Sequence, residues 1–483
     1  MGWLITDSTE KKIPMKKYSP YLFPALALLI AAISFFFHYT PAIRDAVSQT
    51  PAQGFELNIS WWRVLFEPFF GPLIFLLRSP EPISLYGTLF LWLLVLALAG
   101  GWKRNTSVTV NLKRWLRTWP LYFGCAVALF LIAVFAPLPG DTIVNQRPEV
   151  VLVNLHSHSH YSHDGIISPK GQLAWHRRQG FDAFFLTEHN HFAKALDIVE
   201  QQRNGRLPAH PQIMAGMEYS GSNHILLLGL HRVFNSKDYP DKAAIDSAHS
   251  QGGAAIVAHW FTPARNTRPL SFYVDAGADG FEIVNKSEGA FHPGSKAQPV
   301  IDLCRRQSLV MSACCDYHGY GNVGQSWTGL TIPGWRTLNP QERQKNILEI
   351  LRNRQQDRIT VLALNDRPAG RFPVWLRPVQ FFFHYAATLN LIQIVSWFFW
   401  MGLAAGLVRF SSGRAPGSQG LGSQGLARLG LLSGALMIGV GFYMILRGLQ
   451  LRGFNELYFE TSPYLLGLGL CIMAASAKYC KKN

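Results

Sequence analysis

Long apolar runs without a charged residue lie near both ends of this 483-residue chain. They cover residues 21–39, 83–102, 119–138, 386–408, 429–446 and 463–477. Most of them reach the roughly 17–25 residues that a helix needs to cross a bilayer. A large soluble core could also bury such helices, but a cluster of them at each end favours a membrane. We therefore expect six transmembrane helices, the last of which is short and rich in glycine.

Lys and Arg gather in four segments that carry no acidic residue: 11–17, 103–118, 409–428 and 478–482. Such segments stay on the cytoplasmic side of a membrane. Six helices with both termini inside satisfy this rule for all four segments. The pattern predicts a multi-pass protein of a bacterial inner or plasma membrane, with residues 139–385 on the periplasmic or extracellular side.

Two further apolar segments are less regular. Residues 61–78 carry Arg63 and Glu67 and are interrupted by prolines, and residues 371–385 lead into the fourth run. If 61–78 crossed the membrane, the basic loop 103–118 would change sides. We expect both segments to lie at the membrane interface, with the Trp pair of the first at headgroup level.

Between the two apolar ends, short apolar runs alternate with polar helical stretches. Strands are expected at 149–155, 182–187, 212–219, 224–230, 253–259, 280–285, 308–315 and 359–364, and helices at 168–179, 193–203, 241–250, 296–307 and 340–354. This alternation is typical of parallel β/α units, and seven or eight strands favour a closed TIM-like barrel. The predicted organisation is a membrane region at 1–138, an α/β barrel domain at 139–370 and a second membrane region at 371–483.

Composition narrows the classes of function. The formal charge is +16, yet only 15% of residues are charged and 48% are hydrophobic. The apolar content excludes a disordered chain, and six cysteines exclude a disulfide-dense scaffold. Much of the positive charge lies in the four segments that set helix orientation. Nucleic acid is therefore not favoured as a partner.

The histidines of the middle region lie where its predicted strands end. In an α/β barrel these ends face one mouth, so the side chains should converge there. His156 and His158 share one face of a strand, because strand side chains alternate. Imidazoles with carboxylates suit Zn²⁺, Mn²⁺ or iron. The number of candidates implies two or three ions, with Glu218 as a bridge between two of them. The candidates are His156, His158, His163, His189, Glu218, His224, His259, Asp316 and His318.

These motifs resemble the PHP (polymerase and histidinol phosphatase) family over about residues 150–320. The resembling stretches are LHSHSHYSHDGIISP, FDAFFLTEHN, GMEYS, HILLLGL, VAHW and CDYH, in that order. The resemblance implies a distorted (β/α)7 barrel, a di- or trinuclear metal centre with the nine residues above as ligands, and phosphoester hydrolysis. The sequence departs from the family at Glu188, where Asp is usual, and at Trp260, where Pro is common. Asp164 beside His163 leaves open which of the two binds metal.

The expected mechanism is attack on phosphorus by a hydroxide that bridges two ions, with His163, Glu218 and His318 at the catalytic centre. Arg265 and Arg268 could clamp the phosphate, or they are solvated loop charges. His160, His191 and His292 could protonate a leaving oxygen, or they are supporting or surface residues. Cys304, Cys314 and Cys315 could pair in an oxidising compartment, or they are buried thiols.

Three functions compete. The first is a phosphoesterase for a lipid-linked or envelope-associated phosphate mono- or diester, with the bilayer as a partner. The second is a phosphatase or nuclease for soluble phosphoesters that uses its helices as an anchor. The third is a membrane sensor or transporter that binds metal or ligand without turnover. The absence of charged residues from the six runs disfavours a transporter.

Overall fold

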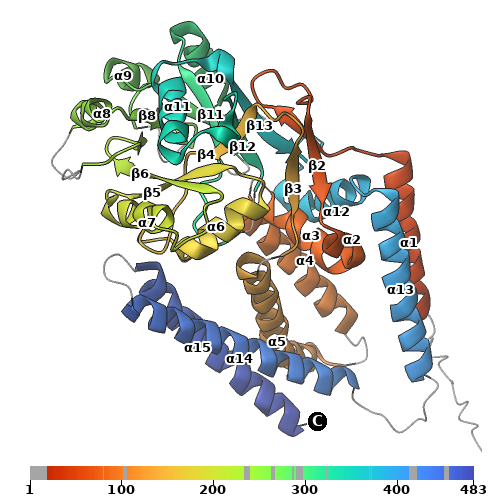
Figure 1. The fold of residues 1–483 in the computed structure, drawn as a ribbon. Helices are drawn as coiled ribbons and strands as arrows, with labels where there is room; N and C mark the ends of the chain where they lie inside the picture. Colours follow the sequence, from red (N-terminus) through yellow and green to blue (C-terminus); the bar gives the residue numbers. More distant parts are fainter. Residues whose placement is uncertain are drawn as a thin grey trace, which may run out of the picture.

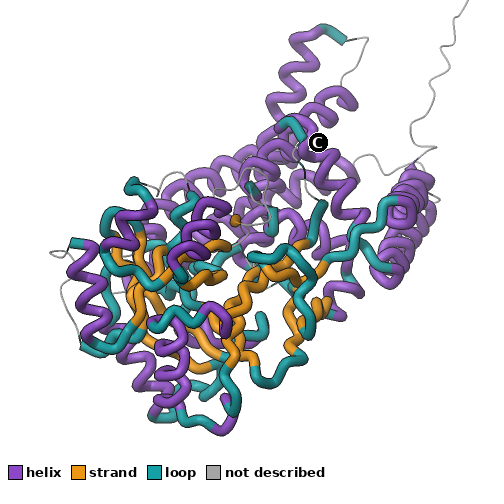
Figure 2. The backbone as a smooth tube through the Cα atoms, turned by 90° about the horizontal axis from the view of Figure 1, so that it is seen from above, coloured by secondary structure: helices purple, strands orange, loops and turns teal. Residues whose placement is uncertain are grey.

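The computed structural model describes residues 19–482 except 80, 102–105, 137, 233–239, 263–266, 286–287, 290–296, 322–323, 369, 371, 413–420 and 451–455. A barrel-like α/β body and a set of long helices make up the molecule (Figure 1). Seen from above, the strands gather within the body and the long helices extend to one side of it (Figure 2).

The body is built on one mixed sheet of 11 strands. Its members are β1 (Ala42–Asp45), β4 (Val150–Asn154), β5 (Ala183–His189), β6 (Gln212–Ser220), β7 (His224–Leu228), β8 (Ala254–Val257), β9 (Gly280–Asn285), β10 (Glu288–Gly289), β11 (Val310–Cys314), β12 (Ser326–Thr331) and β13 (Ile359–Asn365). The order is β1-β13-β12-β4-β5-β6-β7-β8-β9-β10, and β11 pairs with β9. A bridge between Ser157 and Tyr317 brings the end of β11 back to the end of β4. The α/β class is confirmed, and the curled sheet is consistent with a TIM-like barrel.

All eight predicted strands are present, but their directions differ from a purely parallel barrel. β7 runs antiparallel to both β6 and β8, because the three-residue connection after Ser220 is too short for a crossover. β12 was not predicted, and it pairs antiparallel with β4 and β13. The strand β1 comes from the N-terminal region expected to be membrane only, and it covers the edge of β13.

Five helices on the outside of the sheet match the predicted ones: α6 (Pro169–Arg178), α7 (Ala193–Arg203), α8 (Asp241–Ser250), α10 (Ala297–Gln307) and α11 (Pro340–Arg352). The short α9 (Leu270–Asp275) is additional. The local sequence explains where two of these helices begin. The Ser168 side chain caps α6 with Pro169 next to it, and Asn339 and Glu342 form a capping box on α11.

Each of the six predicted membrane runs is helical. They correspond to α1 (Ser19–Phe36), α4 (Pro82–Gly101), α5 (Val108–Phe135), α13 (Leu391–Ser412), α14 (Leu421–Gln450) and α15 (Glu456–Lys482). Within the described residues, one segment, Gly430–Gln450, is long and apolar enough to cross a bilayer. A second segment qualifies as a membrane span only if α12 (Arg377–Ala387) and α13 together form one span despite the 114° bend between them. The structure thus does not support six spans, and that number stays a prediction. The basic segment 11–17 lies outside the described residues.

Large exposed apolar side chains are confined to the flanking regions. In the described part of the chain they fall between Tyr21 and Val144 and between Phe372 and Leu470, and none lies in between. Examples are Phe35 at 81% exposure, Leu93 at 64% and Leu432 at 69%. The flanking helices thus present apolar faces of the kind that mark protein or membrane interaction sites.

Residues 61–78 form α2 (Trp61–Leu65) and α3 (Glu67–Leu77). The two Trp side chains are exposed and stacked on each other, and the interfacial position of this segment stays a prediction. Arg63 and Glu67, in contrast, are buried. Arg63 forms an ion pair with Asp141, at the start of β3 (Asp141–Asn145), and Arg78 Nη1 lies 2.6 Å from the same carboxylate oxygen. Since β3 pairs with β2 (Phe55–Ile59), the segment is joined to the barrel through buried charges.

Candidate metal centre

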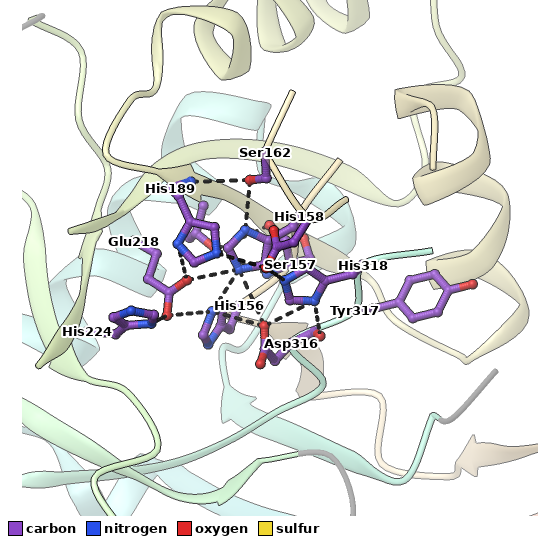
Figure 3. A network of polar contacts seen from close by, with 12 residues as sticks. His156, Ser157, His158, Ser162, His189, Glu218, His224, Asp316, Tyr317 and His318 are labelled. Atoms are coloured by element: carbon purple, nitrogen blue, oxygen red, sulfur yellow. Dashed lines mark hydrogen bonds and ion pairs between the residues drawn. The ribbon is translucent and has the colours of Figure 1, made fainter. Parts of the chain in front are cut away.

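Eight of the nine predicted ligands converge at one end of the barrel. Four overlapping groups of side chains have ligand atoms within 4.8 Å of one another. They are His158, Asp164, His189 and His318; His156, His259 and Asp316; His156, His158 and Glu218; and His189, Glu218 and His224. Figure 3 shows seven of these side chains gathered around a common centre: His156, His158, His189, Glu218, His224, Asp316 and His318. Because the four groups share members, their ligand atoms form one continuous cluster.

The Glu218 carboxylate lies between five histidines. Its Oε1 is 3.3 Å from Nε2 of His156 and 3.3 Å from Nε2 of His259, and it also contacts His224. Its Oε2 is 3.1 Å from Nε2 of His158 and 3.0 Å from Nδ1 of His189. Because the two oxygens face different histidines, this carboxylate has the arrangement of a bridging ligand.

The structure separates the roles of His163 and Asp164, which the sequence left open. Asp164 Oδ2 lies 3.3 Å from His189 Nε2 and 3.1 Å from His318 Nε2, inside one of the groups. His163 belongs to none of the groups, but its ring centroid is 4.7 Å from that of His189. The position of Asp164 makes it a better ligand candidate, with His163 at the edge of the centre.

Two of the converging residues have unusual backbone conformations. His259 has φ of 29° and Asp316 has φ of 46°, the left-handed region that residues with a side chain rarely adopt. Both stand two residues after the end of a strand, β8 for His259 and β11 for Asp316, and both belong to a group of converging ligand atoms. Strained backbone of this kind is found where the surrounding structure holds a side chain in place for function.

A second layer of polar side chains orients the histidines. Glu282 Oε1 lies 2.8 Å from Nδ1 of His156, and Glu282 Oε2 accepts a hydrogen bond from the backbone N–H of His259 at 3.0 Å. The Ser162 hydroxyl lies 3.0 Å from Nδ1 of His158 and donates to Glu188 at 2.6 Å. Ligating histidines commonly hold such partners on the second nitrogen. Glu188 therefore supports the centre from behind, where the sequence showed a departure from the family motif.

Sequence reasoning missed Glu282 because it lies inside β9 rather than at its end. It is fully buried within the otherwise mostly apolar run GFEIVN. A buried carboxylate in an apolar strand needs a partner. The presence of an acidic residue in this apolar strand is the feature of the sequence that could have identified Glu282.

The donor set fits divalent metal ions. Burial alone would raise the pKa of Glu218, but His156, His158 and His224 outweigh it and hold the pKa well below its ordinary value. Burial disfavours charge on His158, yet Asp316 and Glu218 raise its pKa to about 9. The carboxylates at this centre are thus stabilised in their ionised form by positive charge around them. Divalent cations supply that charge and displace protons from the histidines.

Residues 154–362 match the family model of the PHP domain. That segment runs from the last residue of β4 into β13 and contains all residues of the candidate centre. No curated protein matches the chain.

Several solved structures resemble the chain at low identity. One is a two-domain protein from Bacteroides vulgatus that contains a predicted PHP-like metal-dependent phosphoesterase, with 20% identity over 49% of this chain and 70% of that one, and a TM-score of 0.36. Another is a putative metal-dependent phosphoesterase from Bifidobacterium adolescentis, with 15% identity over 35% of this chain and 88% of that one, and a TM-score of 0.28. An amidohydrolase from Chromobacterium violaceum has 16% identity over 40% of this chain and 96% of that one, and a TM-score of 0.29.

The remaining residues predicted for the site lie away from the cluster, support it or fall outside the described part of the chain. Arg265 and His292 are outside the described residues. Arg268 is exposed, and its guanidinium lies 5.4 Å from the Phe272 ring centroid, with no described polar contact to the cluster. His191 Nε2 is 3.0 Å from the Tyr161 carbonyl oxygen. Cys304, Cys314 and Cys315 are buried free thiols, so the expected alternative of a disulfide is not observed.

Proposed function

We propose that this chain is a metal-dependent phosphoesterase held at a membrane by the helices that flank its PHP domain. The observation that carries the proposal is the position of Glu218 between five histidines, with Asp164 and Asp316 beside them. Two or three Zn, Mn or Fe ions suit this set of nitrogen and oxygen donors. The match of residues 154–362 to the PHP domain supports a hydrolase that depends on metal.

Bound ions would lower the pKa of a water molecule and neutralise charge that develops on a phosphoryl group. The chain's own residues orient the donors: Glu282 fixes His156, and Ser162 with Glu188 fixes His158. Asp164 marks the accessible side of the centre, since its side chain is 31% exposed while Glu218 is 1% exposed. His163 and His318 lie next to Asp164 and are placed to hold or transfer a proton there.

A membrane location is supported by the surface of the flanking helices. Their exposed Leu, Phe and Tyr side chains contrast with the barrel, which exposes none of comparable size in its described part. The basic segments predict that the barrel is on the periplasmic or extracellular side. In that position the substrate would be a lipid-linked or envelope-associated phosphoester.

The test of activity uses the full chain in detergent or lipid nanodiscs with Mn²⁺ or Zn²⁺. We expect hydrolysis of p-nitrophenyl phosphate or bis(p-nitrophenyl) phosphate, and loss of about a hundredfold or more in kcat with Glu218→Gln. His156→Ala and Asp316→Ala should also lose activity together with bound metal. The exposed Glu349→Gln is the matched control and should keep full activity.

Two outcomes would point elsewhere. Equal activity of the wild type and Glu218→Gln would contradict the assignment of the centre. Metal binding that is lost in His156→Ala, without turnover of any phosphoester by the wild type, would favour a sensor that uses the same side chains for binding alone.

A further inference from the structure

A cavity of about 490 Å³ lies between the barrel and the long helices. Its walls come from four parts of the chain that are distant in sequence: the end of α5, the start of α6, the turn after β11, and the pair α14 and α15. Most of the lining is apolar or aromatic, and it includes Phe135, Ile167, Tyr317, Val440, Met444 and Tyr458. A cavity of this size and lining is suited to an apolar group of a small molecule.

The same loops that line the cavity also carry the metal centre. Tyr317 and Gly319 line the cavity on either side of His318, and Ile166 lies two residues after Asp164. The Ile166 N–H donates to the His318 carbonyl oxygen at 2.8 Å, which ties the two loops together. In Figure 3 the Tyr317 side chain points away from the cluster, and it lines the cavity. The cavity and the centre are thus separated by a single layer of chain.

An arginine of α14 reaches the metal-bearing loop. Arg447 Nη2 lies 2.9 Å from Nδ1 of His160, two residues after His158. Its other hydrogen-bonding partner in the described part of the chain is the uncharged Gln450, whose Oε1 lies 3.3 Å from Nη1 of Arg447. No described carboxylate pairs with Arg447, and a guanidinium without an acid is well suited to a phosphate.

The cavity also reaches the apolar surface of the helices. Tyr443 lines it and is 58% exposed, and it stands beside Phe442 and Leu446 on the exposed face of α14. These residues belong to Gly430–Gln450, the segment with the length and hydropathy of a membrane span. A hydrocarbon chain could therefore enter from the bilayer without crossing water.

We propose that this cavity binds the hydrocarbon chain of a phosphorylated amphiphile, with the phosphate directed toward Arg447 and the metal centre. The inference rests on the proposed function and specifies its substrate class as phosphoesters that carry a long apolar chain. An apolar wall, a cation one helical turn beyond the lining residue Met444 and an exposed apolar face of α14 occur together at this junction.

The test uses the full chain in nanodiscs and hexadecyl phosphate with a diazirine at the end of its chain. After irradiation, cross-links should map to peptides around α6 and α14, near Ala174 and Val440. Ala174→Phe fills the cavity and should remove these cross-links, whereas Ala435→Phe, exposed on α14 outside the cavity, should leave them unchanged. The inference is overturned if labelling spreads over the exposed helix faces and is equal in both variants.

Turnover provides a second measurement. Ala174→Phe should raise KM for hexadecyl phosphate about tenfold, and Ala435→Phe, outside the cavity, should leave it unchanged. Equal KM values for hexadecyl phosphate in both variants would contradict a role of the cavity in substrate binding. If no phosphoester is hydrolysed but the cross-links are specific, the proposed activity fails while the chain-binding site stands. If phosphoesters are hydrolysed but the cross-links are not specific, the chain-binding site fails while the proposed activity stands.

Discussion

Nδ1 of His156 lies 2.8 Å from the Glu282 carboxylate, although 126 positions separate the two residues. Because an ionised carboxylate only accepts hydrogen bonds, this contact places the proton of His156 on Nδ1. Nε2 of His156 is then free to bind a cation, and it lies 3.3 Å from oxygens of both Glu218 and Asp316. Glu282 is thus a positioning residue for the metal centre.

We expect Glu282→Gln to weaken metal binding about 10–100-fold, the usual effect of losing the outer partner of a histidine ligand. Competition with a fluorescent chelator measures this affinity directly. Glu349→Gln, in an exposed pair with Lys345, is the matched control and should bind metal like the wild type. Unchanged affinity in Glu282→Gln would show that the contact does not orient His156.

Metal removal should destabilise the barrel. Ligands that bind only the folded chain stabilise it by about 2.7 kcal/mol at a hundred times Kd. A chelator should therefore lower the unfolding temperature, and added Mn²⁺ or Zn²⁺ should restore it. His156→Ala should show a smaller shift, since His156 belongs to two of the four ligand groups. Identical melting curves with and without metal would contradict a resident ion cluster.

The buried charges around Asp141 should be necessary for stability. Asp141→Asn leaves Arg63 and Arg78 without their shared anion, and breaking a buried ion pair costs about 3 kcal/mol or more. Denaturant unfolding in detergent measures the loss. Glu149→Gln breaks the partly exposed pair with Arg147 and should change stability by less than about 1 kcal/mol.

The effect of Asp141→Asn on the stability of the fold should depend on pH. Burial opposes ionisation of Asp141, but Arg63 and Arg78 outweigh burial and lower its pKa below the ordinary value. A lowered pKa in the folded state stabilises the fold above the unfolded pKa of about 3.9, and this contribution is lost as the pH falls further. The stability difference between wild type and Asp141→Asn should be constant from about pH 7 to about 5 and shrink below about pH 4. A difference that stays constant into acid would refute this assignment of charge.

Membrane orientation is testable by cysteine labelling in cells. In a chain with Cys125, Cys471 and Cys480 replaced by Ser, Arg206→Cys places a thiol on the barrel surface and Val108→Cys places one at the start of α5. An impermeant maleimide should label the first in intact cells and the second only after permeabilisation. The opposite result would put the barrel in the cytoplasm and favour soluble phosphoesters as substrates.

Strand ends are predictable from the sequence because they combine an apolar run with a polar side chain at a fixed place. This is why His156, His189, Glu218 and Asp316 can be assigned to one centre from the order of residues alone. The same reasoning does not identify Glu282, because this residue lies in the middle of β9 rather than at its end. Contacts between distant segments, such as Gln393 with Glu67 at 2.9 Å, depend on tertiary packing that no local pattern contains.

The long apolar helices show the converse limit. Their existence as helices followed from apolar runs, but hydropathy alone did not predict the bend between α12 and α13. At that bend the Asn390 side chain accepts from the backbone N–H of Gln393, and the Gln393 side chain accepts from the backbone N–H of Asn390. These reciprocal hydrogen bonds start a new helix after Thr388. Two polar residues in the fourth apolar run, Asn390 and Gln393, therefore mark the point at which the chain changes direction between α12 and α13.

The pairing of β1 with β13 has a consequence for biogenesis. The first strand of the sheet to leave the ribosome follows directly after α1, and its partner is the last strand of the sheet to be made. Until β13 is complete, β1 has an unsatisfied edge, which is a site for wrong pairing between nascent chains. Release of the barrel from its N-terminal segment by proteolysis would expose the matching edge on β13. The N-terminal segment that pairs with β13 thus also protects this edge of the barrel against aggregation.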